Sequence, residues 1–319
     1  MTPCPKLPNV ICLMGPTASG KTALAIDLAK QRNFQLVSVD SAQVYRDMDI
    51  GTGKPDAETL IKTPHRLIDI RDPADAYSAS EFRIDALREI QEITSQGDVP
   101  LLVGGTMLYF KALRDGLATM PNADPETRRA IEAKAAALGW ESVHAELAAV
   151  DPVAAQRIHV NDPQRLQRAL EVYRVSGKTL TKYHEEERKK PNSDNGLPFN
   201  LHFFGIQPSD RGVLHNKIRD RFLEMIRLGL VEEVQALRQR SDLNSSLPAL
   251  KSVGYRQVWQ YLEGQLNFEE MVDKGIIATR QLAKRQLTWL RSWEELHALG
   301  GHSSESADYI LKYVDPISI

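Results

Sequence analysis

The sequence contains only two cysteines, Cys4 and Cys12, among its 319 residues. Two cysteines, one of them inside an apolar run, provide neither a disulfide framework nor the spacing of a structural metal site. No apolar stretch approaches the length of a membrane span, and residues 1–8 lack the apolar core of a signal peptide. We therefore expect a cytoplasmic protein that has no contact with a membrane.

A surplus of charge of one sign is also missing. The formal net charge is −2, so nothing in the composition attracts nucleic acid globally, and any basic surface must be local. Apolar residues make up 42% of the chain, enough to fill a real core. Because the chain is longer than a typical single domain, we expect either one large domain with an insertion or two domains.

What the sequence does contain is the segment Gly15–Thr22, which fits the phosphate-binding pattern G-x-x-x-x-G-K-[ST]. The apolar run Val10–Met14 before it is typical of a buried parallel strand, and Thr22–Lys30 after it has apolar residues at helical spacing. A strand, a turn and a helix N-terminus aim backbone N–H groups at one point, where Lys21 adds a positive charge. This P-loop predicts a di- or triphosphate site, with Thr22 as a ligand of the accompanying Mg²⁺. Its predicted phosphate-binding residues are Gly15, Pro16, Thr17, Ala18, Ser19, Gly20, Lys21 and Thr22.

The pattern of the remaining chain predicts an α/β fold, a P-loop parallel sheet core flanked by helices, with an all-helical insertion domain. The core is predicted at 1–117 and 199–319, and the insertion at 118–198. The further predicted strands are 35–39, 66–70, 99–103 and 200–207. One predicted helix of the core has Ser80 as its N-cap and ends near residue 93. The further predicted helices of the core are 106–113, 211–228, 229–239, 254–262 and 268–293. The final thirty residues show a weak signal that fits strand or helix.

Asp40 follows the strand predicted at 35–39, and the carboxyl ends of parallel strands form the ligand crevice of such sheets. We therefore expect Asp40 near the P-loop, within reach of both Mg²⁺ and a second substrate; the alternative is a helix cap or a solvated loop acid. The inner strand Leu101–Val103 ends in Gly104-Gly105-Thr106, without the Asp that NTP-hydrolysing enzymes and kinases usually place there. This absence argues against an ordinary NTPase.

Other clusters give weaker signals. Gln164 and Arg168 lie one turn apart on the helix predicted from Asp162, which suits contacts to phosphates and bases, but a surface helix with an Arg168–Glu171 ion pair explains them equally well. Lys217 and Arg221 are four residues apart and could neutralise a leaving group. The last long helix interleaves basic residues with tryptophans, as a nucleic-acid surface or a solvated face would. These basic residues are Lys274, Arg280, Lys284, Arg285 and Arg291.

Taken together, several segments resemble the tRNA dimethylallyltransferases, also called isopentenyl-tRNA transferases. The resemblance runs in order from about Val10 to Trp293 and is specific because all the segments occur together. The matching segments are Gly15–Thr22, Val39–Tyr45, Met48–Pro55, Pro64–Asp69, Leu102–Thr106, Asp162–Arg165 and Ser252–Gln257.

The resemblance implies transfer of a dimethylallyl group from dimethylallyl diphosphate, held with Mg²⁺ by the P-loop, to the N6 amine of the adenosine 3′ to the anticodon. It implies that Asp40 is the general base and a Mg²⁺ ligand, and that Lys21, Thr106 and Arg221 take part in catalysis. The anticodon stem-loop is expected on the insertion, and the protein is expected to be a monomer. The implied tRNA-contacting positions are Asp40, Ser41, Ala42, Gln43, Thr106, Arg128, Gln164, Arg165, Leu166, Gln167, Arg168, Ser252, Gly254, Tyr255 and Arg256.

Two other functions remain to be weighed. One is a small-molecule or nucleotide kinase that uses ATP, with the insertion as a lid; the missing acid after Leu101–Val103 argues against it. The other is a non-catalytic nucleotide-dependent switch, and the expected position of Asp40 opposite the P-loop argues against that one. The chemistry of prenyl transfer agrees with the residues found, since a weakly nucleophilic adenine amine needs a base and a diphosphate leaving group needs positive charge.

Overall fold

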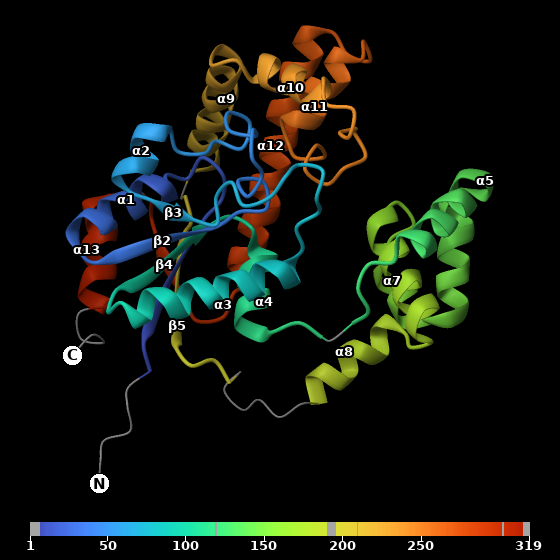
Figure 1. The fold of residues 1–319 in the computed structure, drawn as a ribbon, viewed down its shortest axis with the longest axis horizontal. Coiled ribbons are helices and arrows are strands. Elements are labelled where there is room, and N and C mark those ends of the chain that lie inside the picture. The colour runs from blue at the N-terminus through green and yellow to red at the C-terminus, as the bar shows by residue number, and fades with distance from the viewer. Residues whose placement is uncertain (1–6, 119, 190–195, 209, 302, 315–319) are drawn as a thin grey trace. The chain divides into compact units, whose positions relative to one another are not determined.

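The computed structural model describes residues 7–118, 120–189, 196–208, 210–301 and 303–314. The chain forms two compact units (Figure 1). The first unit combines Met1–Asp115 with Leu197–Ile319, and the second is the segment Gly116–Gly196 inserted between them. Each boundary of the insertion lies two residues before the predicted one.

The first unit is built on a six-stranded sheet, counted over the described residues, in which every pair of neighbours is parallel. The strand order is β3-β2-β4-β1-β5-β6, so β1 lies inside the sheet between β4 and β5. The strands are β1 Asn9–Met14, β2 Phe34–Val39, β3 His65–Arg66, β4 Val99–Gly104, β5 Asn200–Ile206 and β6 Leu296–Leu299. The predicted α/β class with a parallel sheet is confirmed.

The two faces of the sheet are covered by different helices because alternate residues of a strand point to opposite faces. On one face, Ile11 and Leu13 pack with α1 (Lys21–Gln31) and α13 (Ser304–Val314). On the other face, Val10 and Cys12 belong to a larger core that includes several helices of the unit. These helices are α3 (Ala79–Ser95), α4 (Met107–Asp115), α9 (Arg211–Arg227), α10 (Leu230–Arg238), α11 (Tyr255–Leu262) and α12 (Phe268–Arg291).

The register of the central strands sets the position of the functional residues. Met14 at the end of β1 and Val39 at the end of β2 both pair with Gly104 at the end of β4. Three strands therefore end at one level, and the residues that follow them enter the same crevice. Close packing at this level depends on Gly104, since a Cβ there would lie 2.0 Å from the carbonyl oxygen of Val39.

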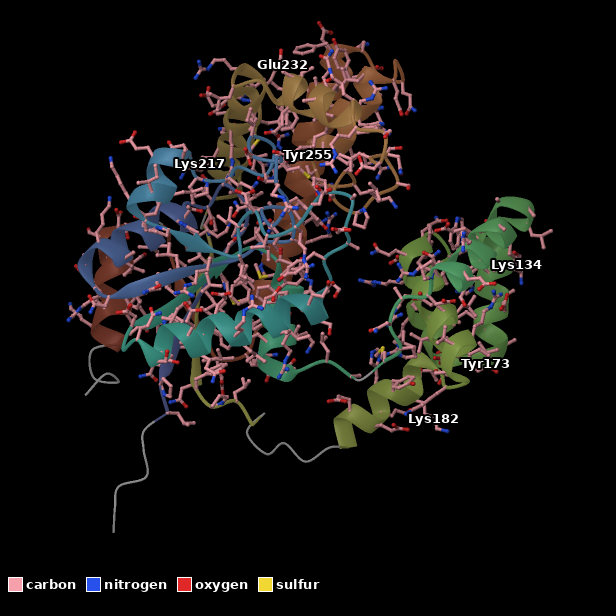
Figure 2. All side chains as sticks on the ribbon, viewed as in Figure 1. Lys134, Tyr173, Lys182, Lys217, Glu232 and Tyr255 are labelled. Atoms are coloured by element: carbon pink, nitrogen blue, oxygen red, sulfur yellow. The ribbon has the colours of Figure 1, made fainter. Side chains whose placement is uncertain are left out.

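The second unit is all-helical in its described residues, as predicted. It contains α5 (Pro125–Val150), α6 (Pro152–Arg157), α7 (Pro163–Ser176) and α8 (Leu180–Lys189). Asp124, Asp151 and Asp162 each cap a helix that has proline in its first turn, where the missing N–H costs nothing. The unit has a hydrophobic core of its own. Lys134, which is labelled on α5 in Figure 2, donates to Glu146 at 2.6 Å. Gly139, with φ of 79°, interrupts the helical backbone of α5.

Some predicted elements differ from the structure. The strand predicted at 66–70 is wrong, because Leu67 and Asp69 adopt left-handed backbone conformations and only His65–Arg66 pairs with β2. The N-cap of α3 is Ser78, which forms a capping box with Glu81, rather than Ser80. The short helices α2 (Ala57–Lys62) and α6 were not predicted, and the weak C-terminal signal corresponds to both a strand, β6, and a helix, α13.

Candidate active site

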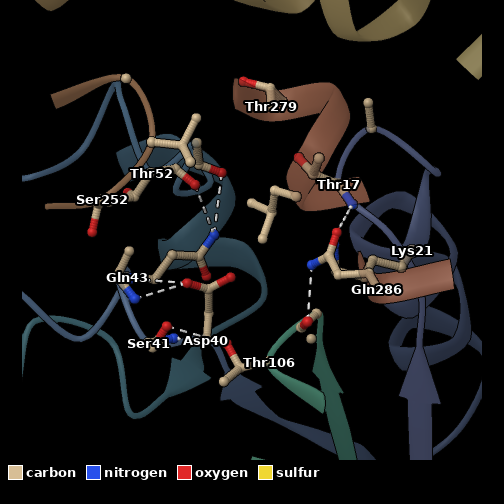
Figure 3. A pocket seen from close by; sticks show the side chains of 18 of the residues that line it. Thr17, Lys21, Asp40, Ser41, Gln43, Thr52, Thr106, Ser252, Thr279 and Gln286 are labelled. Atoms are coloured by element: carbon tan, nitrogen blue, oxygen red, sulfur yellow. Dashed lines mark hydrogen bonds between the residues drawn. The ribbon is translucent and has the colours of Figure 1, made fainter. Parts of the chain in front are cut away.

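A cavity of about 440 Å³ opens at the carboxyl ends of the central strands in the first unit (Figure 3). The P-loop lines one side and Asp40, directly after β2, lines another. Further walls come from the segment after β4, from the loop that contains Gly51–Gly53, and from α9 and α12. The parallel register thus brings together the segments that the sequence predicted at the crevice.

The P-loop forms a tight turn between β1 and the N-terminus of α1. Ala18 and Gly20 have φ angles of 61° and 88°, both in the left-handed region, and Gly20 leads directly into α1. The loop is attached to the sheet by a hydrogen bond from the Gly15 N–H to the Gly104 carbonyl at 3.3 Å. The helix N-terminus and the backbone N–H groups of the loop form the type of concave, positive site that binds phosphate oxygens.

The charged groups of the cavity influence one another's protonation. Burial lowers the pKa of Lys21 to about 8; nearby Arg221 lowers it as well, and Asp40 opposes both effects. Burial also lowers the pKa of Arg221, again opposed by Asp40. Two cations held in a confined site without full neutralisation favour an anionic ligand, because its charge replaces the lost hydration.

Asp40 is oriented by the loop that follows it. Its Oδ1 accepts hydrogen bonds from the backbone N–H groups of Ala42, at 2.9 Å, and Gln43, at 3.3 Å. Its Oδ2 accepts no hydrogen bond from the described part of the chain, so one oxygen remains available to a ligand. Thr106 fixes the start of the same loop, since its Oγ1 accepts from the Ser41 N–H at 3.0 Å.

The wall formed by residues 49–53 is held by residues that lie far away in sequence. The carboxylate of Glu233 on α10 accepts from the N–H groups of Asp49, Ile50 and Gly51 at 2.9, 2.8 and 3.2 Å, and from the Tyr255 hydroxyl. The loop in turn presents the Gly53 carbonyl to the Gln43 amide at 3.3 Å and to Arg221 at 3.5 Å. Sequence analysis missed Glu233, because no local pattern marks an acid that caps a distant turn.

Apolar side chains from α9, α12 and α4 complete the cavity next to these polar groups. They provide a surface for a small hydrocarbon group beside the phosphate-binding loop. The apolar lining includes Met107, Ile218, Phe222, Met225, Leu282 and Trp289.

A family model described as IPP transferase matches residues 43–293, more than half of the chain. The chain belongs to the IPP transferase family. The solved full-length tRNA isopentenylpyrophosphate transferase of Bacillus halodurans is 33% identical with a TM-score of 0.70, over 98% of this chain and 97% of that one. The tRNA delta(2)-isopentenylpyrophosphate transferase of Staphylococcus epidermidis is also 33% identical, with a TM-score of 0.68, over 97% of this chain and 99% of that one.

A eukaryotic dimethylallyltransferase acting on tRNA is 26% identical with a TM-score of 0.70, and the match covers 89% of this chain and 70% of that one. As a member of the IPP transferase family, the chain is a prenyl-transferring enzyme. The family and the solved structures support tRNA dimethylallyltransferase activity and do not favour the kinase. The resemblance found in the sequence is confirmed.

The donor set of this transferase fits the Mg²⁺ that the resemblance implies. Thr22 and Asp40 both line the cavity and offer one hydroxyl and one carboxylate. Mg²⁺ is commonly held by one or two carboxylates together with substrate phosphates and water. The described residues contain no group of three or more His, Cys, Asp or Glu side chains that could hold a metal. One hydroxyl and one carboxylate would hold Mg²⁺ together with phosphate oxygens and water.

In the insertion of the transferase, the predicted tRNA-contacting arginines surround a buried acid. Glu171 has no exposed surface and accepts from Arg128 at 2.7 and 3.1 Å, from Arg168 at 2.7 Å, and from the Asp124 N–H at 2.7 Å. The Arg168–Glu171 ion pair considered from the sequence is therefore present. Arg165 differs, because its side chain is 72% exposed and its Nε lies 3.4 Å from an oxygen of Asp162. Gln164 is exposed and Gln167 half-buried on the same helix.

Three predicted roles need correction. Leu166 lies in the core of the insertion and Tyr255 in the core of the first unit, both with no exposed surface, so direct contact of either residue with RNA is not supported. Lys217 on α9 is exposed (Figure 2) and lies outside the cavity lining, whereas Arg221, one turn later, lines the cavity. Of the expected pair Lys217 and Arg221, only Arg221 lines the cavity.

The remaining predicted positions divide between the cavity and the surface. Ser252 and Gly254 line the cavity, as do Ser41, Ala42 and Gln43, whereas Arg256 is exposed. On α12, Arg285 lines the cavity, while the other basic residues of this helix lie outside the lining.

Within the described residues, no helix is long and apolar enough to cross a membrane.

Proposed function

We propose that the cavity binds dimethylallyl diphosphate, and that the enzyme transfers its five-carbon group to the N6 amine of the adenosine 3′ to the anticodon of tRNA. The observation that carries this proposal is the position of Asp40. A carboxylate with one free oxygen lines the same cavity as the P-loop lysine, and apolar side chains lie beside both. A kinase that transfers phosphate from ATP does not require this apolar surface beside the P-loop.

The diphosphate occupies the P-loop, where backbone N–H groups and Lys21 hold it. Arg221 faces the same region and meets the charge that develops on the leaving group. When bound, Mg²⁺ would be held by Thr22 and Asp40 together with phosphate oxygens, and it would supply further positive charge. The prenyl chain lies against Phe222, Trp289 and their apolar neighbours.

The adenine amine is a poor nucleophile, because its lone pair is delocalised into the ring. As the new N–C bond forms and the C–O bond to diphosphate breaks, the free oxygen of Asp40 accepts a proton from the amine. Ser41, Gln43 and Thr106 line the cavity around Asp40 and contact the base. The adenosine leaves the stack of the anticodon loop to enter, which a single-stranded loop allows at low cost. The insertion holds the anticodon stem-loop through Arg165 and its neighbours.

A labelled-donor assay tests the reaction. Protein is incubated with Mg²⁺ and bulk tRNA together with either labelled dimethylallyl diphosphate or labelled ATP. Label is expected in tRNA only from the prenyl donor. Asp40→Asn should lower single-turnover transfer by about 10²–10⁴-fold while tRNA binding is retained, as expected for loss of a positioned base. Asp47→Asn is the matched control, because Asp47 is exposed and lies in the same loop.

Two results would contradict the proposal. One is transfer of phosphate from ATP that dimethylallyl diphosphate does not inhibit. The other is an Asp40→Asn variant that transfers the prenyl group as fast as the Asp47→Asn control.

A further inference from the structure

Helix α9 carries an apolar stripe that begins at the P-loop. Ile218 belongs to a small apolar cluster against which Ala18 of the P-loop packs. Phe222 follows four residues later, so it lies on the same face of α9, about 6 Å further along the helix axis. Both Ile218 and Phe222 line the cavity. A chain whose diphosphate is held at the P-loop therefore has an apolar path along α9 from Ile218 to Phe222.

Phe222 closes the gap between α9 and α12. The residue is buried, with 3% exposure, and its ring reaches the backbone of Gly275 on α12. A Cβ added at Gly275 would lie 2.1 Å from the Cζ atom at the tip of the ring. Glycine inside a helix is unfavourable relative to alanine, but at this position only glycine leaves room for the ring. The side chain of Phe222 therefore spans the whole distance from one helix to the other.

The ring of Phe222 separates the cavity from the core behind it. Thr279, one turn after Gly275 on α12, lines the cavity (Figure 3), and its hydroxyl donates to the Gly275 carbonyl at 2.8 Å. Gly275 itself and Met271, one turn before it, are buried and lie outside the cavity lining. At this level the boundary of the cavity is thus an aromatic side chain, with the helix backbone directly behind it.

We propose that Phe222 is a specificity-determining residue that limits the donor to a five-carbon prenyl group. The inference rests on the proposed function, because it assumes that the P-loop holds the diphosphate and that the hydrocarbon lies along α9. A longer donor carries its second five-carbon unit at the level of the ring. The ring cannot move back to admit this unit, because the backbone of Gly275 occupies the space behind it.

Transfer to bulk tRNA measures this preference, with labelled dimethylallyl diphosphate and labelled geranyl diphosphate, a ten-carbon donor, as separate substrates. The wild-type protein should have the higher kcat/KM with the five-carbon donor. Phe222→Ala opens the cavity up to the Gly275 backbone and should shift the ratio of the two kcat/KM values by at least about tenfold toward the ten-carbon donor, since even one methylene in an apolar pocket changes such a ratio by about that factor. Leu223→Ala is the matched control and should keep the wild-type ratio, because Leu223 is adjacent, 46% exposed and outside the cavity lining.

A second variant covers the case in which Phe222→Ala does not fold. Phe222→Leu keeps an apolar side chain in the core and removes the tip of the ring, so it should shift the ratio in the same direction. Adding Gly275→Ala to Phe222→Leu places a methyl group where the tip was and should return the ratio toward wild type, which a general loosening of the fold would not do. A folded Phe222 variant with the wild-type ratio overturns the inference, as does a wild-type protein that uses both donors equally well. Failure of the proposed function looks different, because then the wild-type protein would transfer neither prenyl group to tRNA.

Discussion

Glu233 offers a sharp test of how the active-site wall is held in place. The isosteric change Glu233→Gln replaces one carboxylate oxygen by an NH₂ group, which cannot accept a hydrogen bond. In the least damaging orientation the NH₂ faces the Gly51 N–H and the Tyr255 hydroxyl, and the hydroxyl can rotate to accept. The Gly51 N–H then has no acceptor, and the bonds from Asp49 and Ile50 go to a neutral oxygen instead of a charged one.

The magnitude follows from these losses. A hydrogen bond to a charged group contributes about 1.5–3 kcal/mol and a neutral one about 1 kcal/mol. Because Asp49 is exposed and Glu233 is half-buried, each hydrogen bond here contributes a free energy near the lower end of its range. One bond lost and two weakened give a decrease of about 2–3 kcal/mol in the free energy of unfolding. The released loop also moves the Gly53 carbonyl that contacts Gln43 and Arg221, so kcat/KM for prenyl transfer should fall as well.

Urea denaturation and steady-state kinetics measure the two effects. Glu232→Gln is the matched control, because Glu232 is adjacent, exposed and without a hydrogen-bond partner in the described part of the chain. The control should remain within about 0.5 kcal/mol of wild type. The reasoning is refuted if Glu233→Gln unfolds at the same urea midpoint as Glu232→Gln and retains its kcat/KM.

Three further outcomes are expected. Because the pKa of Lys21 is lowered to about 8, its ammonium form is present below that pH and is lost above it, so inorganic diphosphate should bind more weakly as pH rises from about 7 to 9. Calorimetry on Lys21→Arg corrects for the titration of diphosphate itself, since arginine stays charged; identical pH profiles would contradict the assignment. Gly53→Ala would place a Cβ 1.7 Å from the Arg221 Nη2 at a φ of 63°, and should lower the single-turnover rate at least tenfold, about the effect of 1.4 kcal/mol on a barrier. Arg165→Ala should reduce the salt dependence of tRNA binding by about one unit of slope in filter-binding assays, and an unchanged slope would make Arg165 only a solvated side chain.

Local patterns in the sequence were sufficient to predict the P-loop, because consecutive residues form this part of the site. The strand, turn and helix around Gly15–Thr22 follow from apolar spacing and glycine positions within one segment. Asp40 was predicted correctly to line the crevice, because in a parallel sheet the residue after a buried strand must lie at its carboxyl edge. Neither prediction required knowledge of a distant partner.

The parts that were missed depend on contacts between remote segments. Glu233 accepts from N–H groups of residues 49–51, and Gln286 on α12 accepts from the Thr17 N–H and donates to the Gly105 carbonyl. Both residues lie on amphipathic helices whose sequence pattern does not indicate these distant contacts. Leu166 and Tyr255 were assigned to RNA by motif alone, although helical spacing from Leu166 to the buried Leu170 already indicated a core position. The strand expected at 66–70 was wrong because Leu67 and Asp69 adopt left-handed conformations, which apolar spacing along the chain does not indicate.

The place of β1 inside the sheet has a consequence for synthesis of the protein. One neighbour, β4, follows within the first half of the chain, but the other, β5, is made only after the whole insertion. Until residues 200–206 leave the ribosome, β1 presents an apolar edge with unpaired backbone groups, which is a template for intermolecular association. The insertion, with its own hydrophobic core, can fold during this interval. The time needed to translate Gly116–Gly196 therefore decides how long the nascent P-loop strand stays open to aggregation.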